Sequence, residues 1–341
     1  MTIHKTMAIA MVLAAVPALG ARPAAAQVEA GKLARETAKE YRELARYPES
    51  SRALRQGEAD PILEKRLPTR QSRRGADAND PTLSVWASKV SYEKGQPVDL
   101  YATLEGRGKA VPAADAMTGE IADASGAIVA EVTYRDDGQG ADLRANDGVY
   151  SARLTLPGDL EPALAASYMV RVKTRLADGD PVEAAGGFLY SNPAARLTGR
   201  YRDVLRDGNL VVAAEVEVSA RGRFHLAATL STPAGEPIGT AQTAAELEPG
   251  RRWIELSFYG LMFHDRQIAG PYRLGTVALA TTTGMPNALN DLVENAHLTR
   301  PYRLEQMRNQ AFDRPQLLEA AKRLELDAER AEREARGVRE Q

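Results

Sequence analysis

Residues 81–191 consist of short segments in which apolar and polar residues alternate, separated by residues typical of turns. This pattern restricts the possible folds more than any other feature. In the segment VDLYATL at 98–104, Val98, Leu100 and Leu104 alternate with side chains of the opposite face. Such alternation is typical of a half-buried β-strand. Six more strands are predicted at residues 83–88, 116–123, 127–134, 148–156, 166–176 and 182–190. Their number and spacing predict an immunoglobulin-like β-sandwich.

A second series of strands is predicted in residues 197–305, after a joint at 191–196 (SNPAAR). In LVVAAEVEVS, Glu215 and Glu217 alternate with apolar neighbours. The segments RFHLAATLS, RRWIELSFYG, YRLGTVALATT and AHLTRPYR continue the series without a helical run of useful length. We therefore predict an all-β fold class with two tandem immunoglobulin-like antiparallel β-sandwiches and short helical extensions at both ends.

The region between residues 27 and 80 is predicted to form a helix followed by an extended linker. Leu33, Thr37, Tyr41 and Leu44 recur at helical intervals, and Pro48 ends the helix. The polar, proline-punctuated stretch that follows shows no sustained period, as expected for an arm or linker.

Residues 313–341 are predicted to form a charged C-terminal helix. Pro315 suits its first turn, and its apolar stripe is narrow. That stripe comprises Leu317, Ala321, Leu324 and Ala328. The helix either docks on a partner or stands alone in solvent, and the weak stripe favours the second.

Residues 1–26 have the composition of a signal peptide. His4 and Lys5 precede an apolar run, and three alanines at 24–26 fit a small-residue cleavage site. No later segment approaches the length of a transmembrane helix, and the chain contains no cysteine. The formal net charge of −2 gives no sign of a nucleic-acid partner. We expect an exported protein, periplasmic or extracellular.

The histidines give no catalytic motif. His225, His264 and His297 lie outside any HExxH pattern, and the chain shows neither a nucleophile elbow nor a phosphate loop. His264 and Asp265 come nearest to a constellation, but they lie in a connection whose aromatic residues fit packing. We expect no enzyme; a hydrolase assembled from distant residues is the remaining alternative.

Trp253 is the candidate for ligand contact. In RRWIELSF it alternates with Glu255, whereas Ile254 alternates with Leu256 and Phe258. This alternation places Trp253 on the polar face of its strand, where an indole can stack on a sugar or pack at a domain interface. Trp86 is a second candidate of the same kind, although strand tryptophans in sandwiches more often belong to the core.

The segment YRDDGQGADLRANDGVY at 134–150 has two interpretations. Asp137-Gly138 and Asp147-Gly148 are strong tight-turn dipeptides, which explains much of its composition. Asp137, Asp142 and Asp147 also recur every fifth residue, and converging carboxylates suit calcium. The spacing does not match an EF-hand, so turns alone and a cation site both remain open.

The same segment resembles the Asp-Asp-Gly…Gly-Asp…Asp-Gly-x-Tyr signature of immunoglobulin-like modules in secreted bacterial proteins. These include choice-of-anchor proteins and a domain-of-unknown-function group. Here Ala141 separates Gly140 from Asp142, where the family joins the two directly. The resemblance continues through GRFHLAATL, AAELEPGRRWIELSFYG and IAGPYRLGTVAL, and covers about residues 47–305. It implies export, non-catalytic modules and, for a calcium-binding loop, the ligands Asp137, Asp142 and Asp147.

These observations predict an exported, non-enzymatic protein that binds or scaffolds another protein or a surface polymer through its β-sandwiches. A calcium ion at the acidic loop is the candidate cofactor. The alternative function is a carbohydrate-binding module that uses an exposed tryptophan.

Overall fold

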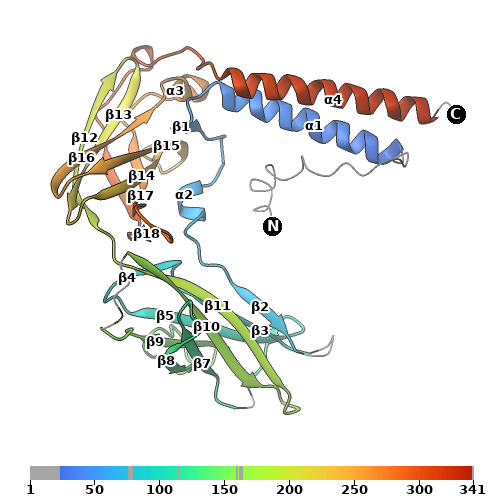
Figure 1. Ribbon diagram of the computed structural model, residues 1–341, viewed down its shortest axis with the longest axis vertical. Helices are drawn as coiled ribbons and strands as arrows, with labels where there is room; N and C mark the ends of the chain where they lie inside the picture. Colours follow the sequence, from blue (N-terminus) through green and yellow to red (C-terminus); the bar gives the residue numbers. More distant parts are fainter. Residues whose placement is uncertain (1–23, 76–79, 114, 159, 161–163, 340–341) are drawn as a thin grey trace. The chain divides into compact units, whose positions relative to one another are not determined.

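The computed structural model describes residues 24–75, 80–113, 115–158, 160 and 164–339 (Figure 1). Most of the predicted signal peptide, residues 1–23, lies outside this part of the chain. The chain is mostly β and divides into two compact units. One unit contains the residues up to Tyr47 together with those from Ala311, and the other is Pro48–Gln310. None of the described helices has both the length and the apolar character needed to cross a bilayer.

The first β region is built from two sheets. One sheet has the order β2-β3-β5-β6, with β9 also paired to β5. The other has the order β4-β11-β10-β7-β8, in which β4 and β11 are parallel and the remaining pairs are antiparallel. The strands are β2 (Gln71–Arg74), β3 (Thr82–Ala87), β4 (Ser91–Glu93), β5 (Val98–Gly106), β6 (Lys109–Ala110), β7 (Thr118–Ala122), β8 (Ile128–Thr133), β9 (Val149–Leu154), β10 (Ala165–Arg175) and β11 (Pro181–Ser191).

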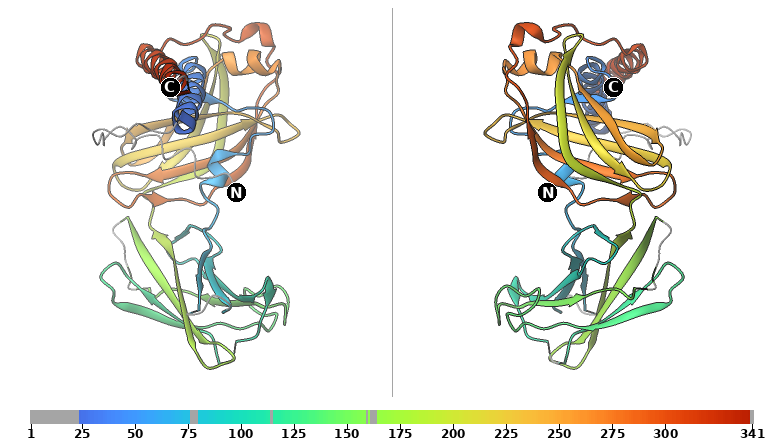
Figure 2. Two further views of the ribbon diagram at one scale, coloured as in Figure 1. Left: turned by 90° about the vertical axis from the view of Figure 1, so that its right-hand side faces the viewer. Right: turned by 90° about the vertical axis from the view of Figure 1, so that its left-hand side faces the viewer.

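The strands of both sheets can be followed in Figure 2. The two sheets share one buried core. Alternate residues of β5 enter it, with Val98, Leu100 and Leu104 at most 1% exposed. Tyr168 and Phe188 come from the opposite sheet and stack with their ring centroids 5.8 Å apart. The alternation predicted for residues 98–104 is therefore observed, because only every second side chain of a strand can reach the core.

The second β region also contains two sheets, with the orders β12-β13-β16 and β1-β15-β14-β17-β18; β19 pairs with β17. Its strands are β1 (Ser51–Ala53), β12 (Ala195–Arg206), β13 (Asn209–Val218), β14 (Gly222–Ser231), β15 (Pro237–Leu247), β16 (Gly250–Phe258), β17 (Arg273–Thr281), β18 (Ala288–Leu289) and β19 (Val293–Leu298). The helix α3 (Leu261–Arg266) interrupts this series, although the sequence predicted no helix there. Six residues are too few to show a helical period in the sequence. The burial of Leu261, Met262 and Phe263 stabilises this short helix.

The segment predicted as a linker contributes structure to both β regions. β1 pairs with β15, and β2 pairs with β3. Between these strands lies α2 (Pro61–Glu64), whose N-cap Asp60 accepts hydrogen bonds from the backbone of Ile62 and Leu63. Short polar strands at a sheet edge lack a strong sequence pattern, which explains why the prediction missed them.

The two ends of the chain form an antiparallel helical hairpin of α1 (Ala24–Ala45) and α4 (Pro315–Arg339), joined by ion pairs. The expectation that the C-terminal helix stands alone in solvent was wrong. Small residues repeat every seven positions along the contact and let the backbones approach: Gly31, Ala38 and Ala45 in α1, and Ala321, Ala328 and Ala335 in α4. A Cβ atom added at Gly31 would lie 3.3 Å from the carbonyl oxygen of Ala328.

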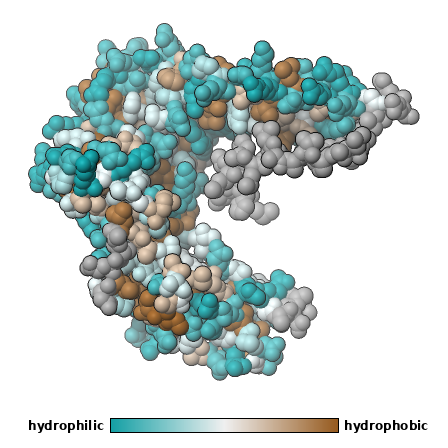
Figure 3. Space-filling view, in the orientation of Figure 1, coloured by the Kyte–Doolittle hydropathy of each residue, from teal (hydrophilic) through white to brown (hydrophobic). Residues whose placement is uncertain are grey.

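The apolar stripe predicted for α1 does not face α4. Leu33 is 64% exposed and Leu44 is 40% exposed, because the small residues occupy the contact instead. The visible face of this hairpin is largely hydrophilic with isolated hydrophobic residues (Figure 3). Scattered exposed leucines of this kind are normal on a surface.

Replacing Ala328 with leucine tests the close helix contact. Leucine and alanine have similar helix propensities, so the variant should act through overpacking, at a cost of about 1–3 kcal/mol. Hydrogen exchange should then become faster in both α1 and α4. The control is Leu326→Ala, at a position that is 52% exposed, which should leave exchange nearly unchanged. Unchanged exchange in Ala328→Leu would contradict the close contact.

Candidate functional site

The acidic loop between β8 and β9 is shaped by residues with positive φ. Gly138, Gly140 and Gly148 have φ values of 71°, 67° and 83°, and Asn146 has 59°. Glycine adopts this conformation without a steric penalty, and asparagine tolerates it. At both predicted turn dipeptides, Asp137-Gly138 and Asp147-Gly148, the aspartate also accepts a hydrogen bond from the backbone N–H two residues later.

Three carboxylates of this loop converge, but they differ in one member from the predicted set. One oxygen from each of Asp136, Asp142 and Asp147 lies within 4.8 Å of the others. Asp137 is not in this cluster; its Oδ1 accepts a hydrogen bond from Gln139 N at 3.0 Å. The five-residue spacing predicted Asp137 in place of Asp136. The prediction was wrong because spacing alone does not show in which direction a turn points each side chain.

Backbone amides hold all three carboxylates. Asp136 accepts hydrogen bonds from Asp147 N at 3.2 Å and Gly148 N at 2.9 Å, and Asp147 accepts one from Val149 N at 2.9 Å. Asp142 is only 7% exposed. The amides of Gly138 and Arg144 lower its pKa, since they stabilise the ionised form. The loop therefore keeps negative charges close together.

Trp86, the second candidate for ligand contact, lies near this loop, and neighbouring side chains contact its ring. The guanidinium of Arg70 lies 4.5 Å from the centroid of its ring, and Tyr101 stacks beside it at 5.6 Å. The hydroxyl of Tyr101 donates to the carbonyl of Ala141 at 3.2 Å. This aromatic pair thus supports the acidic loop.

Trp253 lies on β16 facing away from the core, as its alternation predicted. Ile254, Leu256 and Phe258 are buried, whereas Trp253 is half-buried. The guanidinium carbon of Arg202 lies 4.2 Å from the centroid of the indole ring. A cation over an indole is a favourable contact, so Trp253 is held in place.

A hollow of about 420 Å³ adjoins this tryptophan. At the wall of this hollow, Arg206 donates two hydrogen bonds to the carboxylate of Glu255, at 2.7 and 3.0 Å. This pairing lowers the pKa of Glu255 and keeps it ionised. The lining residues are Arg206, Asp207, Asn209, Val211, Thr243, Ala245, Trp253, Ile254, Glu255 and Ser257. The hollow therefore combines an aromatic surface with charged and hydroxyl groups.

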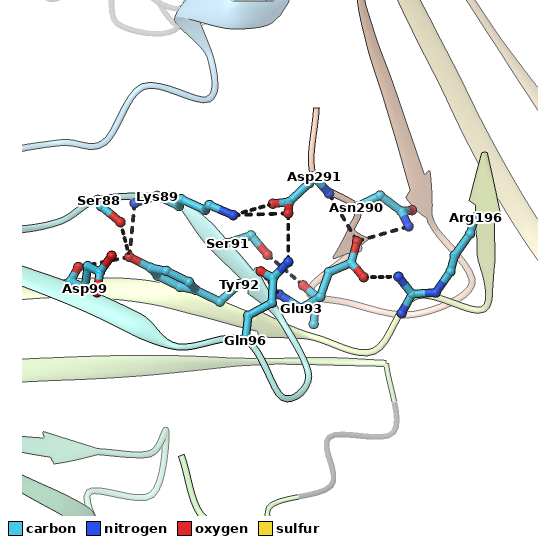
Figure 4. Close-up of polar contacts among 11 residues, drawn as sticks. Ser88, Lys89, Ser91, Tyr92, Glu93, Gln96, Asp99, Arg196, Asn290 and Asp291 are labelled. Atoms are coloured by element: carbon cyan, nitrogen blue, oxygen red, sulfur yellow. Dashed lines mark hydrogen bonds and ion pairs between the residues drawn. The ribbon is translucent and has the colours of Figure 1, made fainter. Parts of the chain in front are cut away.

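A polar network centred on the buried carboxylate of Glu93 joins the two β regions (Figure 4). Glu93 of β4 is 7% exposed and forms an ion pair with Arg196 of β12. Its other oxygen accepts a hydrogen bond from the backbone N of Asp291 at 3.3 Å. The carboxylate of Asp291 in turn accepts hydrogen bonds from Lys89 Nζ at 3.0 Å and from Gln96 Nε2 at 2.8 Å. Nothing in the sequence pattern predicted this network.

A second network that the sequence did not reveal surrounds Asp203 of β12. His297 Nε2 lies 2.7 Å from its Oδ1, and the hydroxyl of Tyr302 donates to Oδ2 at 2.7 Å. Arg300 Nε also lies 3.2 Å from Oδ2. Burial opposes ionisation of Asp203, but these hydrogen bonds together lower its pKa. All three donors follow β17 in sequence, so the network ties β12 to the segment around β19.

His264, the histidine that comes nearest to a constellation with Asp265 in the sequence, makes a contact with the backbone. It lies in α3, and its Nε2 is 3.1 Å from the carbonyl oxygen of Met307. This contact attaches the helix to the segment that follows β19.

Residues 194–294, which contain most of the second β region, match the family model of the C-terminal domain of DUF4785, a domain of unknown function. The resemblance to a domain-of-unknown-function group is thereby confirmed for this part of the chain. A search of curated protein sequences gives no match.

Among solved structures, the chain is similar to a DUF4785 family protein from Legionella pneumophila subsp. pneumophila str. Philadelphia 1. The two are 18% identical with a TM-score of 0.44, and the match covers 66% of this chain and 57% of the other. This chain thus spans a little over half the length of that protein. Trypsin-activated α-2-macroglobulin from Escherichia coli also matches, with 12% identity, a TM-score of 0.25, and coverage of 64% of this chain and 15% of that one.

The Asp203 network predicts a pH-dependent stability. Asp203→Asn should destabilise the protein at neutral pH by about 2–3 kcal/mol, because an amide cannot accept from all three donors. The difference in the free energy of unfolding between wild type and variant should be fully present above the pKa of an aspartate in the unfolded chain, about 3.9. It should disappear as the pH falls through the lower pKa of Asp203 in the folded protein. Chemical denaturation at pH 7 and pH 3 measures it. Asp207→Asn, in the exposed turn after β12, is the matched control and should change stability little.

Proposed function

We propose that this chain is an exported, non-enzymatic protein that binds another protein or a surface polymer through two tandem immunoglobulin-like β-sandwiches. The hollow beside Trp253 is the observation that carries this proposal. It offers an indole surface together with the Arg206–Glu255 pair, groups that suit a polymer with both apolar and polar faces. The polar network around the buried Glu93 supports a scaffolding role, because it ties the two β regions together.

A carbohydrate is the alternative ligand at the same place. Sugars present an apolar face to aromatic rings and hydroxyl groups to charged side chains. Trp253 supplies the ring, and Glu255 lies two residues further along the same face of β16. Arg202 covers the indole at 4.2 Å, so a sugar would take the remaining surface or displace this side chain.

A glycan array tests the role of Trp253. The wild-type protein should bind a subset of glycans, and Trp253→Ala should weaken that binding at least tenfold because the aromatic surface is lost. Trp86→Ala is the control, since Arg70 and Tyr101 already contact that ring. Equal glycan binding by wild type and folded Trp253→Ala would contradict the role of Trp253, and absence of glycan binding by the wild type would remove the carbohydrate alternative.

We also propose that calcium stabilises the acidic loop. Asp136, Asp142 and Asp147 would be the protein ligands, with Asp136 in place of Asp137. Three carboxylates within 4.8 Å repel one another, and a hard divalent cation would relieve that repulsion. Their backbone hydrogen bonds support the arrangement with or without an ion.

Thermal melts with calcium test this proposal. Calcium at 100 times its dissociation constant should stabilise the wild-type protein by about 2.7 kcal/mol and raise its melting temperature. Asp147→Asn retains an acceptor for Val149 N but loses the charge, so the response to calcium should disappear. Without calcium it should melt no lower than wild type.

Asp137→Asn is the matched control, because Asp137 belongs to the same loop but not to the cluster. It should keep the full response to calcium. A wild-type protein whose melting temperature ignores calcium, or an equal response in Asp147→Asn, would contradict the site.

A further inference from the structure

The outer face of the sheet β12-β13-β16 carries several arginines, and all but one of them pair with a carboxylate. The exception in this described part of the chain is Arg202 of β12, whose guanidinium carbon lies 4.2 Å from the centroid of the Trp253 ring. The paired arginines are Arg196 with Glu93, Arg200 with Glu215, Arg206 with Glu255, and Arg251 with Glu217. The face therefore presents one guanidinium whose hydrogen-bond donors are used by no carboxylate of these strands.

A bulge in β12 explains how the nearest buried carboxylate is satisfied without Arg202. Residues 198–200 of β12 face the single residue Glu215 of β13. Glu215 is 5% exposed; Thr198 Oγ1 donates a hydrogen bond to it at 2.9 Å, and Arg200 lies 3.6 Å away. Bulges often lie next to functional sites, because they redirect side chains. Here the bulge supplies both partners of Glu215 and leaves Arg202 to the indole.

The contact with Trp253 leaves the N–H groups of Arg202 available. A guanidinium is planar and carries five donors at its edge, so a contact through its face does not use them. Arg202 is exposed, and a carboxylate can accept two parallel hydrogen bonds from such an edge. The cation–π contact also holds the guanidinium in place, so less side-chain entropy is lost when a ligand binds.

The acidic residues near this guanidinium do not cancel its charge. Glu255 accepts hydrogen bonds from Arg206 with both carboxylate oxygens. Asp207 also lines the hollow, but it lies five residues beyond Arg202 in the chain, roughly 17 Å along an extended strand. Screening at physiological ionic strength acts over about 8 Å. A ligand charge beside the indole therefore interacts more strongly with Arg202 than with Asp207.

We propose that Arg202 makes the hollow beside Trp253 selective for acidic polysaccharides whose sugar units carry a carboxylate. The apolar face of the sugar ring would contact the indole surface that Arg202 leaves free, and the carboxylate would accept hydrogen bonds from the guanidinium. A neutral sugar would gain the stacking contact alone. This inference rests on the carbohydrate alternative proposed above, and it adds the chemical class of the polymer and the residue that selects it.

Oligomers of galacturonate, glucuronate and mannuronate are the probes, each compared with its methyl ester. Esterification removes the charge and keeps the sugar ring, so each pair isolates the contribution of the carboxylate. In calorimetric titrations of the purified full-length protein, at least one acid should bind tenfold or more tightly than its ester. Added salt should weaken the binding of the acid and leave the binding of the ester nearly unchanged.

Variants assign this preference to one side chain. Arg202→Gln should reduce the affinity for the acid at least tenfold without reducing the affinity for the ester. Arg202→Lys should retain part of the preference, because an ammonium keeps the charge but not the planar fork. Arg221→Gln is the control for the same change in net charge. Arg221 is exposed and pairs with Glu248, so this variant should bind like wild type.

The outcomes separate this inference from the carbohydrate alternative on which it rests. Trp253→Ala should weaken the binding of acid and ester together, because both use the indole. Equal binding of every acid and its ester, or an undiminished preference in folded Arg202→Gln, would overturn the selective role of Arg202 and leave carbohydrate binding intact. Absence of binding by all acids, esters and neutral glycans would remove both proposals.

Discussion

The ion pair and the hydrogen bond of the buried Glu93 carboxylate connect the two β regions. A buried charge is tolerated only when it is paired and hydrogen-bonded, because its removal from water is costly. Glu93 meets Arg196 and the backbone of Asp291, both from the second β region. Ser91 and Ser191 add a buried hydroxyl contact at 2.8 Å within the first region. The joint is therefore specific in geometry, since each polar group requires its own partner.

Strand edges are the second constraint that organises the molecule. The chain covers the edge of β15 with β1 and extends the β3 sheet with β2, two strands from a segment with no sequence period. β2 also lies close to β11 of the facing sheet, so the same segment contacts both sheets of the first β region. A covered strand edge stabilises the fold, because an exposed row of backbone N–H and C=O groups would otherwise attract another chain.

Much of the candidate site could be predicted from local pattern, and the rest could not. Alternation placed Trp253 on the outer face, and the glycine-containing turns of the acidic loop were expected. The choice of Asp137 over Asp136 failed, because convergence depends on side-chain direction in a folded loop. The Asp203 network was missed because His297 lies almost a hundred residues away in the chain, with no motif linking the two.

The sequence by itself determined the strand-rich character, the direction in which alternating residues face and the presence of helices at both ends. These properties follow from periods of two and 3.6 residues, which are local. Only the tertiary structure decided which strands pair, that α4 lies on α1 through small residues, and which charges meet around Glu93 and Asp203. Such contacts join residues far apart in the chain, and their energies depend on burial and distance, which no local pattern contains.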